Sequence, residues 1–144
     1  MIERCRFVNL FQGISTSDDV QDVYHTGLAI SNNTFDSCRS QSIYALGWKT
    51  PLLIGNEFKN MPTSKRALYM MGMINPEIAE NTFSAIDKPV SILTNTVWKE
   101  NEISTVLKSK LIEENIFMNI NFPYIEFKLN ESTNLETWKL ETNN

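Results

Sequence analysis

The chain has 144 residues, which is the size of one domain and long enough to bury a continuous core. Hydrophobic residues make up 42% and charged residues 21%, and the formal net charge is -4 at pH 7. The 13 Lys and Arg residues form no run, which argues against nucleic-acid binding, and no apolar stretch reaches the roughly 18 residues of a membrane span.

A six-residue pattern recurs along the chain: a large apolar residue, two variable residues, Asn, one variable residue, and Phe or Ile. The copies lie at residues 30–35, 53–58, 78–83, 98–103 and 112–117. A degenerate copy at residues 2–7 has Cys5 in place of the Asn. A repeat this short cannot bury its apolar side alone and becomes stable only when copies stack. The pattern therefore predicts a solenoid.

The spacing of the aromatic positions predicts the size of each coil. These positions are Phe7, Phe35, Phe58, Phe83, Ile103 and Phe117, at intervals of 28, 23, 25, 20 and 14 residues. The middle intervals fit one turn of three short strands and three corners. The long first interval predicts a protruding loop near residues 15–25, and the short last interval predicts a tight coil or part of a cap. Repeat-like residues follow Met1 directly, which suggests either a piece cut from a longer chain or a small protein whose first coil is covered by something else, and we favour the first of these.

Each coil contains a second apolar segment after the aromatic position. These segments alternate with a period of two, as strands do, and no sustained period of 3.6 residues is present. They lie at residues 14–16, 43–46, 68–71, 90–93 and 106–107. The sequence therefore predicts strands throughout, apart from one short helical turn within residues 16–22.

The pattern changes near residue 121. Residues 124–129 alternate, residues 130–134 are typical of a turn, and residues 135–140 could pair back onto the preceding strand. An open solenoid end has unpaired strand edges that need a cover. We therefore expect coils over residues 1–120 and a cap or oligomerisation segment over residues 121–144.

Cysteine and asparagine usage adds two expectations. Cys5 and Cys38 occupy different positions in their repeats, and we expect both to be free thiols that line the core. Asn makes up about one residue in nine. Its side chain satisfies tight turns and its backbone tolerates the left-handed conformation, so sharp corners would use it. Equivalent amides on coils about 4.8 Å apart could also bond to one another.

The repeated Ile/Leu-x-x-Asn-x-Phe pattern, followed by a second short strand, resembles the right-handed parallel β-helix family of pectate-lyase-like enzymes and bacteriophage tailspikes. The resemblance covers about residues 2–129. It implies an all-β, right-handed parallel β-helix of about five to six coils with a C-terminal capping element. It also implies a ladder of stacked amides formed by Asn33, Asn56, Asn81, Asn101 and Asn115.

In this family the strand after the aromatic position usually forms an outer face that is used for polysaccharides. The residues that would point outward in register are Ser15, Tyr44, Tyr69 and Ser91. Tyr44 and Tyr69 would then form a flat aromatic platform on which sugar rings stack. Cross-strand pairing of two half-exposed tyrosines is the alternative interpretation. The predicted substrate-binding residues are Tyr44, Tyr69, Trp48, Lys65 and Arg66.

The next outward row contains Leu46, Met71 and Leu93, with Ser17 before them. Monomers rarely expose a contiguous apolar patch of this kind. We expect the loop at residues 15–25 or a second copy of the chain to cover it. The resemblance to tailspikes implies a homotrimer.

The richest cluster of titratable side chains lies in the long loop and contains Asp18, Asp19, Asp22 and His25. Two carboxylates could act as the catalytic pair of a glycosidase. Carboxylates with a bound cation and a basic residue could instead support lyase chemistry, and an acidic surface loop without catalysis is the third interpretation. No metal-binding motif, phosphate-binding loop or Gly-x-Ser-x-Gly motif is present, and we expect no cofactor.

The leading functional hypothesis is recognition of a bacterial surface polysaccharide by a segment of a tailspike-like or other extracellular fibre protein. A polysaccharide lyase or glycosidase on the same fold is the enzymatic alternative, and a trimeric stalk or maturation piece without ligand is the structural one. We expect an extracellular or virion-associated location, although the N-terminus lacks the features of a signal peptide. Neither a nucleic acid nor a membrane is an expected partner.

Overall fold

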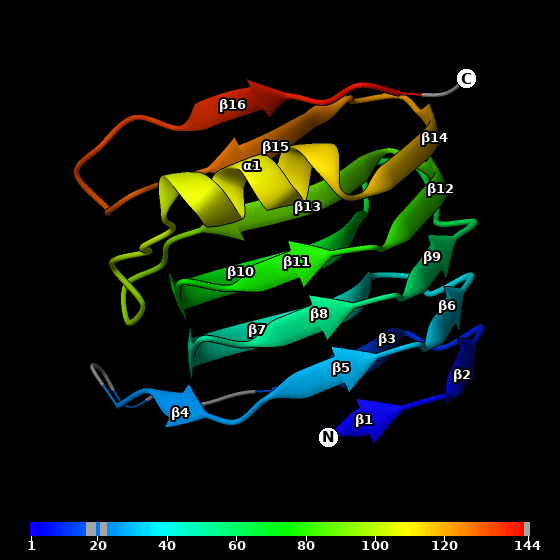
Figure 1. The fold of residues 1–144 in the computed structure, drawn as a ribbon, viewed down its shortest axis with the longest axis horizontal. Helices are drawn as coiled ribbons and strands as arrows, with labels where there is room; N and C mark the ends of the chain where they lie inside the picture. Colours follow the sequence, from blue (N-terminus) through cyan, green and yellow to red (C-terminus); the bar gives the residue numbers. More distant parts are fainter. Residues whose placement is uncertain (17–19, 21–22, 143–144) are drawn as a thin grey trace.

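The structure, a computed structural model, describes residues 1–16, 20 and 23–142. Its strands form three mostly parallel sheets, stacked as a β-solenoid of about three turns (Figure 1). The prediction of an all-β solenoid is confirmed, whereas the expected count of five to six coils is not. Within the described residues, no helix is both long and apolar enough to span a membrane.

Successive coils contribute strands to each of the three sheets. The first sheet has the order β1-β5-β8-β11, from Ile2–Glu3, Ala29–Ser31, Leu52–Ile54 and Glu77–Ala79. The second has the order β2-β6-β9-β12-β14, from Arg6–Val8, Thr34–Asp36, Glu57–Lys59, Thr82–Ile86 and Ile116–Ile120. The third has the order β3-β7-β10-β13-β15-β16, from Gln12–Ser15, Gln41–Lys49, Arg66–Ile74, Lys88–Leu93, Tyr124–Phe127 and Glu136–Lys139. Strand β4 (His25–Thr26) pairs with the end of β7.

A ladder of buried asparagines joins the coils at the corner between the first and second sheets. The Nδ2 atom of Asn33 donates to Oδ1 of Asn56 over 3.1 Å. The same bond, 3.0 Å long, joins Asn56 to Asn81 and Asn81 to Asn115. Each Nδ2 also donates to a backbone carbonyl of the preceding coil, and the Oδ1 of each also accepts a backbone N–H from that coil. The buried amides are therefore satisfied only when neighbouring coils are in register.

Aromatic rings stack beside the amide ladder. Their centroids are 4.8, 4.9, 4.8 and 5.1 Å apart and their planes differ by 13° or less, in the order Phe7, Phe35, Phe58, Phe83 and Phe117. All except Phe7 are buried. The ring spacing matches the distance between neighbouring strands, so each ring packs on its equivalent in the next coil. The ladder and the ring stack confirm the predicted stacking of the repeat.

The prediction that Asn101 belongs to the ladder and Ile103 to the ring stack is wrong. The Oδ1 atom of Asn101 accepts the backbone N–H of Met73 over 2.9 Å. Its Nδ2 atom donates to the carbonyls of Leu93 and Lys128. Asn101 therefore fixes an excursion of the chain beside the third sheet. Residues 98–103 match the six-residue pattern because here, too, a buried Asn stands between large apolar residues.

Helix α1 (Thr105–Glu113) replaces the strand predicted at residues 106–107. It begins after Ser104, whose hydroxyl accepts the backbone N–H of Leu107 and caps the helix. The helix packs beside β11, at the end of the first sheet (Figure 1). Leu111 is its one buried residue, so the helix has no continuous apolar stripe, and the 3.6-residue period is missing from the sequence.

The C-terminal segment closes the third sheet. Strand β15 pairs in parallel with β13, and β16 pairs with β15 in the antiparallel direction. The prediction that residues 135–140 pair back is confirmed. The two ends of the stack therefore differ. At the C-terminal end α1 packs beside β11, the last strand of the first sheet, and β16 is added to the edge of the third sheet.

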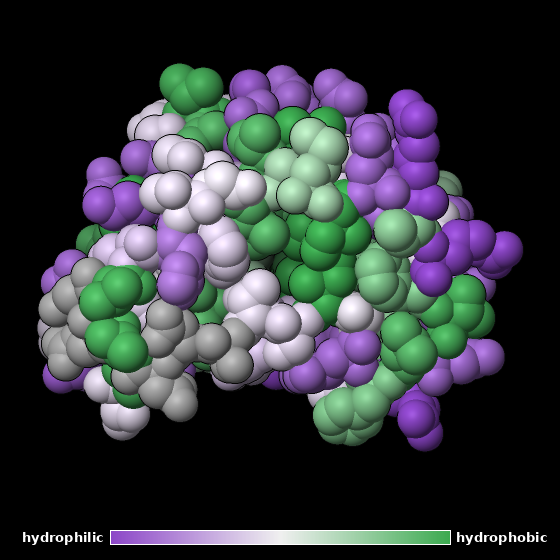
Figure 2. All heavy atoms as spheres, turned by 90° about the horizontal axis from the view of Figure 1, so that it is seen from below, coloured by the Kyte–Doolittle hydropathy of each residue, from purple (hydrophilic) through white to green (hydrophobic). Residues whose placement is uncertain are grey.

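At the N-terminal end, strands β1, β2 and β3 are the terminal strands of their sheets among the described residues. Val8, Leu10 and Phe11 are exposed there, and Figure 2 views this end and shows hydrophobic side chains across its centre. Both cysteines are free, but Cys38 is buried and Cys5 is exposed. The prediction that Cys5 lines the core is therefore wrong, because it lies in this outermost coil. The short helical turn expected within residues 16–22 falls largely on residues outside the described ranges.

The outward apolar row is confirmed, and the chain itself covers it. Leu46 and Met71 are buried beneath Trp98, which is 1% exposed. Tyr24, from the first long loop, packs against Trp98 with ring centroids 5.3 Å apart. The segment after β13, through Trp98, and the loop expected at residues 15–25, through Tyr24, both cover the row. Because the row is covered within one chain, it does not by itself require a second copy or a trimer.

Two glycines in neighbouring strands make room for the Trp98 ring. Gly47 and Gly72 have φ values of +68° and +66°. A Cβ atom on Gly47 would lie 2.3 Å from Cη2 of Trp98, and one on Gly72 would lie 2.5 Å from its Cε3. Glycine is required here both for the backbone conformation and for the close approach of the indole.

Replacing Gly72 with Ala should therefore destabilise the protein more than replacing Gly27. Gly27 has a φ of +82° but no atom within 4 Å of an added Cβ, so Gly27→Ala pays only the backbone strain. We expect Gly72→Ala to cost about 1–3 kcal/mol beyond that control, because it overpacks the Trp98 site. Urea denaturation of both variants measures the difference. Equal losses in the two variants would show that Trp98 does not rest on Gly72.

Candidate functional site on the outer face of the third sheet

Beside the Trp98 cover, the outer face of the third sheet has polar and aromatic side chains in register. One row crosses the strands through Ser15, Tyr44, Tyr69, Ser91 and Glu126. A second row, nearer the strand starts, contains Gln12, Gln41, Arg66 and Lys88. The register of Ser15, Tyr44, Tyr69 and Ser91 that we predicted from the sequence is confirmed.

Tyr44 and Tyr69 lie side by side on β7 and β10. Their ring centroids are 5.5 Å apart and their planes are tilted by 44°, so the pair forms a stepped surface and not a flat one. Both residues are half-buried, and both pack against the cluster of Leu46, Met71 and Trp98. That cluster supports one edge of the pair while part of each tyrosine stays exposed to solvent.

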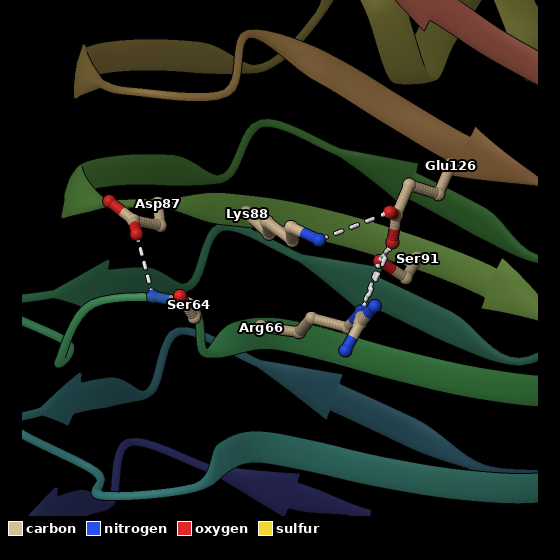
Figure 3. A network of polar contacts seen from close by, with 6 residues as sticks. All are labelled: Ser64, Arg66, Asp87, Lys88, Ser91 and Glu126. Atoms are coloured by element: carbon tan, nitrogen blue, oxygen red, sulfur yellow. Dashed lines mark hydrogen bonds and ion pairs between the residues drawn. The ribbon is translucent and has the colours of Figure 1, made fainter.

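Arg66, which lies over the Tyr69 ring, and Lys88 both bind the carboxylate of Glu126. Figure 3 shows this network. The Nε atom of Arg66 donates to Oε2 of Glu126 over 3.1 Å and to Oγ of Ser91 over 2.9 Å. The hydroxyl of Ser91 is bonded to the same Oε2 over 2.5 Å, and Lys88 Nζ donates to Oε1 over 3.3 Å. The network therefore ties together β10, β13 and β15.

Glu126 is ionised at neutral pH. Burial alone would raise its pKa, but the hydrogen bonds from Ser91 and Arg66 and the charges of Arg66 and Lys88 outweigh burial, and the pKa lies below its ordinary value of 4.5. A general acid needs a raised pKa to hold its proton near neutral pH. The environment of Glu126 therefore suits a fixed negative charge better than proton transfer.

The polar cluster has more positive than negative charge. Lys65, Arg66 and Lys88 supply three cations, against the two carboxylates of Asp87 and Glu126. Asp87 accepts the backbone N–H of Ser64 and the side-chain amide of Asn121, so its carboxylate points away from the Glu126 network (Figure 3). The guanidinium of Arg66 lies over the Tyr69 ring, 5.1 Å from its centroid. A positive edge therefore borders the tyrosine pair.

The structure brings together only some of the predicted substrate-binding residues. Tyr44, Tyr69 and Arg66 adjoin one another, and Lys65 is an exposed residue just before β10. Trp48 is separate: its Nε1 donates to Oγ1 of Thr16 over 3.0 Å, and its ring centroid lies 5.2 Å from that of His25. Of the predicted catalytic residues, the structure places only His25, beside Trp48. The others, outside the described residues, are Asp18, Asp19 and Asp22.

Lys88 and Glu126 belong to the site although the sequence analysis did not include them. Residues 125–127 alternate in the same phase as residues 90–92, and aligning these two segments would have placed Glu126 opposite Ser91. Ser91 and Glu126 are 35 positions apart in the sequence, and the segment between them, which contains Trp98 and α1, hides this pairing.

Two cavities lie away from the candidate site. A cavity of about 300 Å³ lies near Glu100, Glu102 and Asn130, and one of about 660 Å³ lies at the C-terminal end near Phe117 and Leu140. Neither cavity is lined by Tyr44, Tyr69 or Arg66. In the part of the chain that the structure describes, no group of three or more His, Cys, Asp or Glu side chains could hold a metal ion.

Comparisons of the chain with protein-family models, with curated proteins and with solved structures found no match. The β-solenoid is therefore established by the structure of this chain alone. Because a fold of this kind hosts many functions, a functional assignment must come from the chemistry of the site.

The Glu126 network predicts a pH-dependent loss of stability. At pH 7 we expect Glu126→Gln to lower the free energy of unfolding by about 1–3 kcal/mol, since the bonds it weakens involve charged groups. The pKa of Glu126 is lower in the folded than in the unfolded protein. Its stabilising contribution is therefore complete above pH 4.5 and is lost as the pH falls through the folded value.

Urea denaturation of the wild type and of Glu126→Gln, from pH 7 to pH 3, measures this contribution. Asp36 and Asp87, whose pKa values are also lowered, titrate in both proteins, so the difference between the two isolates Glu126. The gap should narrow below pH 4.5. A gap that stays constant over the whole range would contradict an ionised, stabilising Glu126.

Proposed function

We propose that the outer face of the third sheet binds a bacterial surface polysaccharide, and that the chain is a segment of a tailspike-like or other extracellular fibre protein. The observation that carries this proposal is the pair of half-exposed tyrosines on neighbouring coils, with the Arg66 guanidinium at its edge. Aromatic rings offer faces on which sugar rings stack, and nearby polar groups fix the orientation of the hydroxyls.

The shape of the surface suits a polymer. The row from Ser15 to Glu126 crosses five strands, which at about 4.8 Å per step is a length of about 19 Å. Ser15 is exposed and Tyr44 and Tyr69 are partly exposed, whereas Ser91 and Glu126 are buried, so the accessible part of the row spans β3, β7 and β10. The Trp98 cover bounds the row on one side. A chain of sugars could therefore lie along the solenoid axis and contact successive coils.

Binding without turnover is the form of the proposal that the described residues favour. A depolymerase would need an acid and a base beside the bound sugar. Glu126 has a lowered pKa and uses both oxygens in the network, while His25 lies beside Trp48, away from the tyrosine pair. A lyase or glycosidase on this fold would thus depend on groups elsewhere.

Removing the tyrosine rings should weaken glycan binding. In titration calorimetry with oligosaccharides from bacterial capsules and lipopolysaccharides, we expect Tyr44→Ala and Tyr69→Ala each to lower affinity about tenfold, which corresponds to about 1.4 kcal/mol per lost stacking contact. Phe11→Ala is the control, because Phe11 is an exposed aromatic residue at the N-terminal end of the stack. Unchanged affinity in the Tyr44→Ala/Tyr69→Ala double variant, or no binding by the wild type, would refute the proposal.

A further inference from the structure

No described helix or strand covers the N-terminal end of the stack. Strands β1, β2 and β3 each pair with a single neighbouring strand, so the other edge of each carries backbone N–H and C=O groups without a strand partner. Val8, Leu10 and Phe11 are exposed at the same end, and Figure 2 shows hydrophobic side chains across its centre. Free strand edges beside exposed apolar side chains form a surface on which another chain can add strands.

The corner between β1 and β2 indicates which kind of strand fits this edge. Each ladder asparagine holds the coil before it through both ends of its amide, as Asn33 holds Cys5 and Ile2. Cys5 stands at the ladder position of the first coil and has no amide with which to hold another parallel coil. An antiparallel strand needs only the backbone groups of the edge, so the edge suits a chain that runs in the opposite direction.

A second copy of the chain, turned end over end, supplies strands in that direction. About a two-fold axis across the solenoid, β1 of one copy runs antiparallel to β2 of the other, and the same contact forms twice. Residues directly opposite each other in an antiparallel pair project to the same face of the sheet. Inward side chains must therefore meet inward side chains, and outward side chains must meet outward ones.

One register obeys this rule and pairs complementary side chains at every position. Its opposite pairs are Ile2 with Phe7, Glu3 with Arg6, and Met1 with Val8. The residues of the first pair pack against the core, and the other four residues are exposed. The interface would thus contain two apolar pairs and one ion pair, and the two-fold axis doubles each of them.

We propose that the N-terminal end of the stack binds a second copy of the chain, in a two-fold dimer that pairs β1 of each copy with β2 of the other. In this register the axis passes between Arg4 and Cys5. The two Cys5 residues then lie beside each other with their Cα atoms about 6 Å apart, as the spacing between strands and the rise along them require. The dimer goes beyond the proposed function and does not depend on the polysaccharide site, because it uses the end of the solenoid and not the outer face of the third sheet.

Sedimentation velocity of the whole chain, from about 1 to 100 μM, tests for the dimer. We expect a reversible equilibrium between monomer and dimer that shifts toward the monomer as salt rises, because the ion pairs are exposed. A monomer at every concentration would overturn the proposal and leave this end for a partner of another sequence. A trimer or an open-ended assembly would also overturn it, since a two-fold contact closes at two copies.

Reversing charges tests the register. We expect Glu3→Arg to raise the dissociation constant of the dimer at least about tenfold, because it places like charges opposite each other twice. Glu3→Arg/Arg6→Glu restores opposite charges and should recover the dimer. Glu141→Arg, the same reversal at an exposed position beyond β16, is the matched control and should leave dimerisation unchanged. A single reversal without effect, or a double variant that is monomeric with a native circular dichroism spectrum, would refute the pairing of β1 with β2.

Cys5 gives a second readout that needs no charged variant. Both cysteines are free, but only Cys5 is exposed, so a thiol reagent reaches Cys5 and not Cys38. A short bismaleimide should link wild-type chains into a covalent dimer. It should not link Cys5→Ser chains, although these should still dimerise in sedimentation. Wild-type dimers that the reagent fails to link would show that Cys5 lies away from the two-fold axis, and would overturn the proposed arrangement.

Discussion

The amide ladder at the corner of each coil is the interaction on which the rest of this structure depends. Asn33, Asn56 and Asn81 each bond to the coils on both sides of them, and Asn115 bonds to the preceding coil and to α1; all four are buried. Shifting one coil by a single residue would leave several buried donors and acceptors unpaired, at a cost of about 1–3 kcal/mol each. The ladder thus sets the register. The stacked Phe rings and the outward rows of the third sheet follow from that register.

The register also divides the outer face of the third sheet into two parts. Leu46 and Met71 align into an apolar strip, which Trp98 covers at the point where Gly47 and Gly72 let the indole approach the backbone. The rows before this strip carry the tyrosines and Arg66, which are partly exposed, and the Glu126 network, in which Ser91 and Glu126 are buried. Glu126 has two roles here, because it links three strands of the sheet and also fixes the guanidinium that borders the tyrosine pair.

The parts of the fold that the sequence predicted are those that repeat. Asn56, Phe58 and their equivalents recur at nearly constant spacing, so the stacking and the order Ser15, Tyr44, Tyr69, Ser91 could be inferred before any coordinates. The inference from the repeat failed in the segment inserted between β13 and β14. Asn101 matches the pattern but serves a different chain reversal, and α1 buries only Leu111 and so lacks a helical period. Lys88 and Glu126 were missed because their pairing spans the inserted segment, which a local pattern cannot bridge.

Hydrogen exchange of the asparagine side-chain amides, followed by NMR on the ¹⁵N-labelled protein, tests the ladder most directly. If Asn56 and Asn81 are bonded between coils, their Nδ2 protons should exchange only through global unfolding, many orders of magnitude more slowly than those of the exposed Asn9. Exchange at Asn56 and Asn81 as fast as at Asn9 would mean that the coils are not held in this register, and the arrangement of the outer face would lose its basis.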